Sequence, residues 1–264
     1  MNDSINDAQE IEIFRLTSGK KIKVKDKVIK EIPLTIFVNN IKIGTLLCTP
    51  SKLKYLALGF LLSQGIIGFN QKDKVKDIYL NPDKNFVKIK LDLPEEKIKT
   101  SHLEPHELSS CGACTFYDNF KTRFLMVPDS GFQIDRKTLF SQMEEFEKKS
   151  ALFKITGGNH SCALCNKNGI EILTEDIGRH NALDKLLGWC FLEKKDVKDG
   201  FILLSGRISW EIVDKASLAS VPLIASPSAP TDLAISLANK LNLTLVGFLR
   251  EKRMNIYTHP RRVT

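Results

Sequence analysis

Apolar and polar residues follow different patterns in the two parts of this chain. In the first hundred residues, apolar positions recur with a period of two, which is typical of strands with one buried face. This pattern predicts strands over residues 21–30, 34–38, 41–47, 75–80 and 86–91. Asn39 and Asn40 tolerate positive φ angles and predict a tight hairpin between the second and third strands. Helical spacing of apolar residues predicts one helix over residues 52–63.

A charged, proline-containing stretch over residues 93–108 is interpreted as a linker. Beyond it, helical segments alternate with short apolar runs. Helices are predicted over residues 138–149, 179–193, 209–219 and 231–241. Strands are predicted over residues 162–165, 170–174, 201–204, 222–225, 243–248 and 254–258, with another short strand ending at Thr156. This alternation predicts a mostly parallel sheet with helices on its faces. We therefore expect a β-rich subdomain over residues 1–105 and an α/β domain over residues 106–264.

Four strand-to-helix junctions are rich in glycine, serine, threonine and basic residues. They span residues 156–160, 175–181, 205–209 and 226–231. In a parallel sheet such loops gather at the carboxyl edge, where helix N-termini present free N–H groups to phosphate. With the cationic side chains they predict a pocket for a polar, multiply phosphorylated small molecule. The candidate binding residues are Gly157, Gly158, His160, Arg179, His180, Ser205, Gly206 and Arg207.

Each of these features also has a purely structural interpretation. Asp176, Ser209 and Thr231 can be N-caps, and glycines at strand ends can be turn residues. His180 and Asp184 lie one helical turn apart and can form a surface pair. The basic run over residues 248–255 is typical of a solvated hairpin tip. It follows a predicted strand at the same edge, however, where its cations can contact phosphate.

Composition and charge narrow the function classes. The chain has 264 residues, 42% hydrophobic and 27% charged, which excludes disorder and coiled coil. Its most apolar stretch, residues 56–69, is interrupted by polar residues and glycines and is shorter than the ~18 residues that cross a bilayer. The polar N-terminus lacks secretory-signal features, so we expect a cytoplasmic protein with no membrane partner. A net charge of +8 suits an anionic partner, but no dense basic face indicates nucleic acid.

Four of the six cysteines form two C-x-x-C pairs, which indicate sulfur or metal chemistry. Cys111 and Cys114 follow the linker in a loop that favours the reactive thiolate. The second pair occupies a predicted strand, where side chains three positions apart point to opposite faces. A Cys₄ zinc site built from both pairs stays an alternative. The cysteines predicted to be buried thiols are Cys48, Cys162, Cys165 and Cys190.

Six segments, in this order, resemble one known family. They are SSCGAC at 109–114, TGGNH at 156–160, EDIGRHNALDK at 175–185, SGRIS at 205–209, SAPTDLA at 228–234 and VGFLREKRMNIYTHP at 246–260. From about Pro33 to Arg261 the chain resembles the formate dehydrogenase accessory proteins of the FdhD family, which are sulfurtransferases needed for formate dehydrogenase maturation. The second C-x-x-C pair departs from the family pattern and leaves a metal or redox role open for it.

The resemblance implies an α/β fold with a cytidine-deaminase-like mixed sheet, helices on both of its faces, and a smaller β-rich N-terminal portion with one helix. It implies that sulfur passes from a cysteine desulfurase to the molybdenum (or tungsten) bis(molybdopterin guanine dinucleotide) cofactor, Mo-bis-MGD, before this guanine-nucleotide-containing cofactor enters formate dehydrogenase. Carried over by motif, Cys111 bears the persulfide and Cys114 is its partner. The matching cofactor-binding segment is Phe248, Leu249, Arg250, Glu251, Lys252 and Arg253.

Further expectations concern assembly and rival functions. We expect a homodimer and no permanently bound metal. The zinc deaminase signature H-x-E…P-C-x-x-C is absent, so deamination is not expected. His160 and His180 are candidates for proton transfer or polar contacts near the pocket. Two alternatives are a cofactor-binding chaperone that transfers no sulfur, and a zinc-binding structural protein that uses both C-x-x-C pairs.

Overall fold

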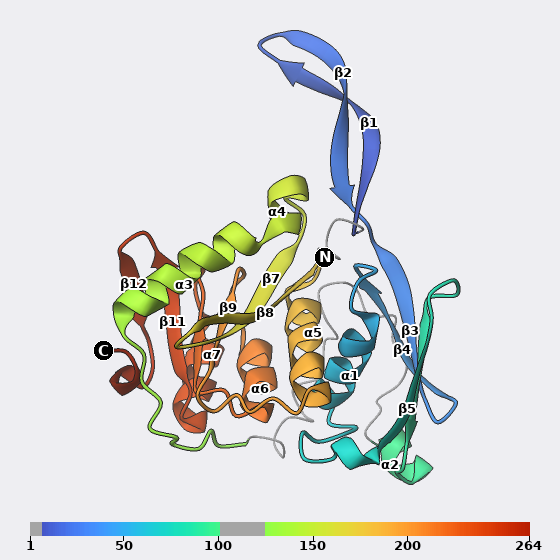
Figure 1. The fold of residues 1–264 in the computed structure, drawn as a ribbon, viewed down its shortest axis with the longest axis vertical. Coiled ribbons are helices and arrows are strands. Elements are labelled where there is room, and N and C mark those ends of the chain that lie inside the picture. Colours follow the sequence, from blue (N-terminus) through green and yellow to red (C-terminus); the bar gives the residue numbers. More distant parts are fainter. Residues whose placement is uncertain (1–6, 101–124) are drawn as a thin grey trace.

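A four-stranded sheet and one helix form the core of the N-terminal portion. The computed structural model describes residues 7–100 and 125–264 (Figure 1). The sheet has the order β4-β3-β6-β5. Its strands are β3 (Ile32–Val38), β4 (Ile41–Cys48), β5 (Val75–Asn81) and β6 (Phe86–Leu91). Asn39 and Asn40 both adopt positive φ, 46° and 69°, so the predicted hairpin is confirmed. Helix α1 (Leu53–Ser63) packs its apolar residues against this sheet, as predicted.

A long hairpin, which the sequence patterns predicted only in part, precedes this sheet. Strand β2 (Lys20–Ile29) was predicted, whereas its partner β1 (Ala8–Thr17) was not. Ile11 and Ile13 of β1 alternate with Glu10 and Glu12, so the period of two is present in its sequence. Glu10 and Glu12 are paired across the hairpin with Lys25 and Lys23, at 2.8 and 2.7 Å. In Figure 1 this hairpin projects away from the rest of the molecule.

The larger portion contains a six-stranded sheet with the order β12-β11-β10-β9-β7-β8. Its strands are β7 (His160–Asn166), β8 (Gly169–Asp176), β9 (Phe201–Leu204), β10 (Leu223–Ala225), β11 (Thr244–Arg250) and β12 (Arg253–Ile256). Only the β9–β10 and β10–β11 pairs are parallel, while the other three are antiparallel. The prediction of a mostly parallel sheet is therefore wrong, and the mixed sheet is confirmed. The reason is that β7 and β8 form a hairpin, as do β11 and β12, without a crossover helix.

Helices cover both faces of this sheet, as expected. Helix α3 (Arg136–Lys149) packs on one face, and the other face carries α5 (Arg179–Leu192), α6 (Trp210–Leu218) and α7 (Asp232–Leu241). The short strand predicted to end at Thr156 is instead helix α4 (Ala151–Thr156). The amides of Leu152 and Phe153 donate to the buried carboxylate of Glu175, at 3.3 and 3.4 Å. This long-range contact gives hydrogen-bond acceptors to the free amides in the first turn of α4. The local sequence does not specify this helix.

The stretch interpreted as a linker is only partly irregular. It contains a short helix, α2 (Glu95–Thr100), so the N-terminal portion has more than the one expected helix. Two 3₁₀ turns are η2 (Lys72–Lys74) and η4 (Pro260–Arg262). The expected boundary between residues 105 and 106 lies outside the described residues. None of the helices within residues 7–100 and 125–264 is both long and apolar enough to span a membrane.

The two portions are joined by a close contact between α1 and α5 (Figure 1). Gly59 of α1 lies against the backbone of α5, where an added Cβ would be 1.8 Å from the Asp184 carbonyl oxygen. Gly188 of α5 lies against α1, where a Cβ would be 1.9 Å from the Tyr55 carbonyl oxygen. The absence of a side chain at both positions is what allows the helices to approach so closely. This contact fixes α5, whose first turn carries candidate site residues.

Candidate functional site

Five loops meet at one edge of the six-stranded sheet, which we call the loop edge. They are residues 156–160, 175–181, 205–209, 226–231 and 248–253. Strands β8, β9, β10 and β11 reach this edge with their carboxyl ends. Strand β7 begins there because it runs antiparallel to both neighbours. The structure therefore gathers the junction loops at one edge, although the sheet is mixed rather than parallel.

Hydrogen bonds connect neighbouring loops along this edge. The Ser161 amide donates to Ser205 Oγ at 3.0 Å, and Ser226 Oγ donates to the Gly206 carbonyl at 2.7 Å. Farther along, the Phe248 amide donates to the Ser228 carbonyl at 3.1 Å. The loops thus form one continuous polar rim. Each of these bonds has a backbone group on at least one side, and the two hydroxyls belong to half-buried Ser205 and buried Ser226, so the rim does not depend on exposed side chains.

His160, Gly206 and Arg179 lie together in the middle of the rim. A Cβ at Gly206 would be 3.1 Å from His160 Nδ1 and 3.7 Å from Arg179 Cβ, so glycine leaves room for both side chains. Ser205 Oγ is 3.4 Å from His160 Nδ1. Burial lowers the pKa of His160, and the nearby Arg179 charge lowers it further. His160 is therefore a neutral imidazole at pH 7 that can donate or accept one hydrogen bond.

His180 lies beneath the rim rather than on it. Its side chain is 2% exposed, and Nε2 is 3.2 Å from Glu211 Oε2 without the alignment of a hydrogen bond. Burial lowers the pKa of His180 to about 2, with further contributions from the charges of Lys215 and Arg179. Burial also raises the pKa of Glu211. A side chain this buried supports the rim from below and does not offer its ring to a ligand.

The predicted surface pair between His180 and Asp184 is wrong. Asp184 is 1% exposed and pairs with Lys215, whose Nζ lies 2.7 Å from Oδ2, while Ser63 Oγ donates to the other carboxylate oxygen at 2.5 Å. These three residues come from α5, α6 and α1. Asp184 does not pair with His180, one helical turn away, because α6 and α1 bring better-placed partners to it.

A second buried network anchors the 175–181 loop. Lys185 and Asp176 are both fully buried and their charged atoms are 2.7 Å apart. Thr49 donates its amide to the same Asp176 oxygen at 3.1 Å and accepts from Lys185 Nζ at 2.6 Å through its hydroxyl. Asp176 Oδ1 accepts from the Gly178 amide and from Asn181 Nδ2. Asp176 is therefore not the N-cap of α5, whose N-cap residue is Gly178.

Three buried polar atoms near the N-termini of α5 and α6 have no hydrogen-bond partner among the described residues. One is His180 Nε2, which lies beneath the rim beside Glu211. The other two are Arg179 Nε and Ser209 Oγ. Ser209 is the N-cap residue of α6, as predicted, but its hydroxyl makes no capping bond. Thr231, in contrast, caps α7 by accepting from the Ala234 amide at 3.3 Å. Buried polar atoms without partners are rare in native proteins, so these two indicate a place for a polar ligand.

The segment from Phe248 to Arg253 closes the rim at the end of β11. Phe248 and Glu251 adopt positive φ of 53° and 58°, and the register shifts between Gly247 and Arg250. The exposed side chains are Arg250, Glu251, Lys252 and Arg253. Arg253 stacks over the Phe248 ring, with its guanidinium carbon 5.6 Å from the ring centroid. Leu249 is 0% exposed and packs in the core, so only its backbone faces this edge.

The remaining predicted binding residues also belong to the loop edge. Gly157 ends α4 with a positive φ of 65° and is exposed, as is Gly158, which packs beside Ile29 of β2. Ser205 is half-buried, and the Arg207 side chain is exposed. Together with Arg179 and the cations of the last loop, Arg207 makes this edge basic.

Cys111 and Cys114 lie outside the described residues. The second C-x-x-C pair lies in β7, with Cys162 in the core on the α5 side of the sheet and Cys165 in the core on the α3 side. As predicted, the two thiols point to opposite faces and cannot bind one ion together. Burial raises the pKa of both. Within the part of the chain that the structure describes, no three histidine, cysteine or acidic side chains converge on a possible metal position.

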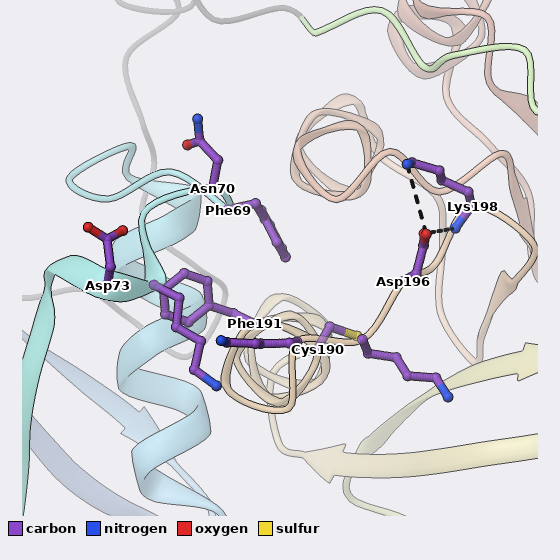
Figure 2. Close-up of a pocket in the computed structure, with 10 residues that line it drawn as sticks. Phe69, Asn70, Asp73, Cys190, Phe191, Asp196 and Lys198 are labelled. Carbon is purple, nitrogen blue, oxygen red and sulfur yellow. Dashed lines mark hydrogen bonds and ion pairs between the residues drawn. The ribbon is translucent and has the colours of Figure 1, made fainter.

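A cavity of about 770 Å³ opens at the other end of α5 (Figure 2). Its apolar floor contains Phe69, Cys190 and Phe191, and its remaining lining residues are Asn70, Lys72, Asp73, Lys194, Lys195, Asp196 and Lys198. Arg179 and Cys190 occupy opposite ends of α5, which places the cavity roughly 17 Å along the helix from the loop edge. The cavity is thus separate from the candidate site.

Sequence reasoning missed the supporting residues of the loop edge. Glu175 is 5% exposed and accepts from Asn159 Nδ2 at 3.0 Å and Ser161 Oγ at 3.3 Å, so it fixes the start of β7. Glu211 and Lys215 contact His180 and Asp184 from α6. Their spacing of four residues was the available signal, but it is equally typical of a solvated helix face.

Comparisons with known proteins agree over almost the whole chain. The model of the FdhD/NarQ family matches residues 29–264. The sulfur carrier protein FdhD of Bacillus subtilis (strain 168) is 36% identical over 264 residues, which cover 100% of this chain and 99% of the relative. The protein of that name from Staphylococcus aureus (strain MRSA252) is 36% identical over 267 residues, covering 100% and 98%.

A solved structure shares the fold. The crystal structure of a formate dehydrogenase accessory protein from Desulfotalea psychrophila superimposes with a TM-score of 0.79 and 23% identity, and the match covers 97% of this chain and 99% of that one. Five of the six motifs that carry the family resemblance contribute to the loop edge, and the sixth, at residues 109–114, lies outside the described residues. The chain belongs to the FdhD/NarQ family.

Proposed function

We propose that this protein is a sulfur carrier that passes persulfide sulfur from a cysteine desulfurase to the molybdenum (or tungsten) bis-MGD cofactor destined for formate dehydrogenase. Its relatives are named sulfur carrier proteins and a formate dehydrogenase accessory protein. In this proposal Cys111 carries the sulfur and the loop edge holds the cofactor as cargo. Sulfur transfer through a covalent persulfide makes the protein a sulfurtransferase.

The first chemical step is a thiolate attack. Cys111 thiolate attacks the outer sulfur of the desulfurase persulfide, the sulfur–sulfur bond of the donor breaks, and the donor cysteine leaves as a thiolate. A persulfide remains on Cys111. Cys114, three residues away, assists this exchange or receives the sulfur in turn. A C-x-x-C loop suits the step because it lowers thiol pKa and holds a second sulfur nearby.

The other four cysteines are poor carriers. Cys48, Cys162, Cys165 and Cys190 are buried free thiols. Burial raises the pKa of Cys190 to about 12 and shifts the other three in the same direction. At neutral pH these four thiols stay protonated and shielded from a partner protein. This supports the first C-x-x-C pair as the sulfur-bearing one.

The observation that carries the cofactor assignment is the convergence of cations and buried, partnerless polar atoms at one edge. Arg179 Nε and Ser209 Oγ are buried without a protein partner, and Ser209 stands at the N-terminus of a nine-residue helix. The exposed cations Arg207, Lys252 and Arg253 share this edge. Helix N-termini and guanidinium groups bind phosphate oxygens, and bis-MGD carries two pyrophosphates. His160 supplies a neutral polar contact.

The test separates sulfur loading from cofactor binding. Wild-type protein incubated with a desulfurase and cysteine should gain one sulfur atom on Cys111 by mass spectrometry. Cys111→Ala should lose this adduct and abolish maturation of formate dehydrogenase while binding bis-MGD normally. Lys252→Ala/Arg253→Ala should show the opposite, with normal sulfur loading and weaker cofactor binding. Cys162→Ala, a buried thiol, is the matched control and should load sulfur like the wild type.

Other outcomes favour the alternatives. Full maturation activity of Cys111→Ala, with no persulfide on the wild type, indicates a cofactor chaperone without sulfur transfer. Stoichiometric zinc that is lost in both Cys111→Ala and Cys162→Ala indicates a structural zinc protein. Either result contradicts the sulfur-carrier proposal.

A further inference from the structure

The β1–β2 hairpin is a two-stranded sheet that pairs with no other strand among the described residues (Figure 1). Its ten-residue strands are about 33 Å long at the usual rise per residue. A hairpin of only two strands is marginally stable in water unless something packs against it. Because the hairpin extends away from the core, we expect another molecule to pack against it.

Apolar side chains are exposed on both faces of the hairpin. Ile11 and Ile22, on one face, are 37% and 47% exposed. On the opposite face Phe14 and Leu16, which lie near the tip, are 66% and 75% exposed. Large apolar residues gathered on a projecting element indicate an interaction site. Because both faces are apolar, the hairpin suits a partner surface that closes around it.

The hairpin is also basic. It contains six basic and three acidic residues between Ala8 and Ile29, an excess of three positive charges. Lys23 and Lys25 are partly neutralised by Glu12 and Glu10, so the excess comes from the remaining cations. Lys21 lies near the tip, where its Nζ is 4.5 Å from the centroid of the Phe14 ring. Apolar groups framed by lysines are complementary to a surface with apolar pockets and an acidic rim.

The base of the hairpin adjoins the loop edge. A Cβ on Gly158 would be 3.2 Å from Ile29 Cγ2, and β2 packs against α4, which leads into that loop. Phe153 and Ile155 of α4 are themselves 51% and 38% exposed, and they extend the apolar surface from the hairpin toward the edge. A partner held by the hairpin is thereby brought next to the proposed cofactor site. Residues 7–28 precede the segment that the family model matches.

We propose that the β1–β2 hairpin docks the acceptor enzyme, formate dehydrogenase in its cofactor-free form, through an acidic cleft with apolar walls. This proposal rests on the proposed function, because a protein that hands over a cofactor at the loop edge must hold the acceptor beside it. The donor enzyme has no need of the cofactor-binding edge. Excess positive charge steers an acidic acceptor toward that edge and lets it dissociate after delivery.

The cavity at the end of α5 is a poor receptor for the hairpin of a second copy of this chain. The cavity described above is lined by Lys72, Lys194, Lys195 and Lys198, of which Figure 2 labels Lys198 beside Asp196. These lysines outnumber the two acidic residues of the lining, Asp73 and Asp196. The cavity therefore carries the same sign of charge as the hairpin, and the two repel each other.

The experiment measures the dissociation constant of the complex between this protein and purified cofactor-free formate dehydrogenase from the same organism. It compares the full-length wild type with two variants. Phe14→Ser/Leu16→Ser should weaken binding by about tenfold or more, since apolar anchors at an interface centre dominate affinity. Lys20→Glu/Lys21→Glu should weaken it at low salt and reduce its salt dependence. Matched controls with similarly exposed residues elsewhere are Tyr79→Ser/Leu125→Ser and Lys84→Glu/Lys90→Glu, and both should bind like the wild type.

Because the changed side chains are exposed, thermal unfolding of the variants should match the wild type. Equal affinity of wild type and Phe14→Ser/Leu16→Ser, or no binding by the wild type, overturns the proposal. So does a wild-type dimer that this variant converts to a monomer in sedimentation, which would identify a second copy as the occupant. Sulfur loading of Cys111 by a desulfurase should be normal in both hairpin variants. Failure of loading in the wild type would instead contradict the proposed function.

Discussion

Two lysine–carboxylate pairs in this protein have the same separation and opposite surroundings. Lys185 and Asp176 are 2.7 Å apart at the junction of the two portions, and both side chains are fully buried. Lys23 and Glu12 are also 2.7 Å apart, on the projecting hairpin, with exposures of 58% and 61%. The distance between the charged atoms therefore does not tell which pair matters more for stability. Burial does, because removing one partner of the buried pair leaves an uncompensated charge out of reach of water.

The same contrast applies to the regions that contain the pairs. The junction is buried and hydrogen-bonded around Thr49 and Asp176, and it fixes the loops that form the candidate site. The hairpin exposes apolar and cationic side chains and has no core of its own. The junction thus maintains the geometry of the candidate site, whereas the hairpin is available for contact with another molecule.

Lys185→Met should show the strongest effect on folding. It removes the buried partner of Asp176, and breaking a buried ion pair costs roughly 3–5 kcal/mol of unfolding free energy. Urea denaturation measures the loss. Lys185→Met/Asp176→Asn, which removes both charges, should recover part of it. A single variant as stable as the wild type would contradict the role assigned to the junction.

Gly59→Ala tests the close helix contact at the same junction. Its new Cβ would be 1.8 Å from the Asp184 carbonyl oxygen, which is backbone and cannot rotate away. Separating α1 from α5 should cost about 1–3 kcal/mol or more by thermal or urea unfolding. At Gly131, where no atom lies within 4 Å, the change to alanine meets only the strain of a φ of 69°. Gly59→Ala should therefore be clearly the more destabilising of the two.

The pH dependence of stability tests the buried position of His180. Its folded pKa of about 2 lies far below the ordinary value near 6.5 of an unfolded chain. Below pH 6.5 the unfolded state binds a proton that the folded state does not, so the contribution of His180 is complete above this pH and is lost as pH falls. The stability difference between wild type and His180→Gln should shrink by about 1.4 kcal/mol per pH unit below pH 6.

Denaturation curves of both proteins between pH 7 and 5 give this difference. A constant offset between wild type and His180→Gln would show that the fold does not lower the pKa of His180.

Lys23→Gln should have the smallest effect. The pair with Glu12 is exposed on both sides, so water and salt replace the lost partner. The midpoint of urea unfolding should stay within experimental error of the wild type. A loss comparable to that of Lys185→Met would mean that the hairpin is part of the cooperative core, which would remove the distinction drawn above.

Local pattern was sufficient for most elements of this fold. The strand periods of residues 34–38 and 86–91 and the helical period of residues 52–63 each appear where they were predicted. The prediction failed where distant contacts decide the conformation. Helix α4 depends on Glu175 for its first turn, and β1 becomes a strand through its antiparallel pairing with β2.

The candidate site divides in the same way. The glycine-rich and basic composition of the junction loops predicted Arg179, Gly206 and Arg207 as residues of one edge, because the carboxyl ends of parallel strands meet at the same edge of a sheet. Nothing local distinguished His180 from a surface residue. Its burial beneath the rim results from the packing of α6, which carries Glu211 and Lys215, against α5. No single segment of the sequence reveals this packing.

The sequence by itself determined the family, the α/β class and the loops that carry polar chemistry, because motifs and periodicity are properties of short segments. The burial of the charged side chains and the direction of the strands in the six-stranded sheet, in contrast, followed only from the folded structure. Burial and pairing depend on residues far apart in the chain, such as Thr49 with Asp176 or Ser63 with Asp184. Desolvation, which acts only once these segments meet, then sets the pKa of each buried group.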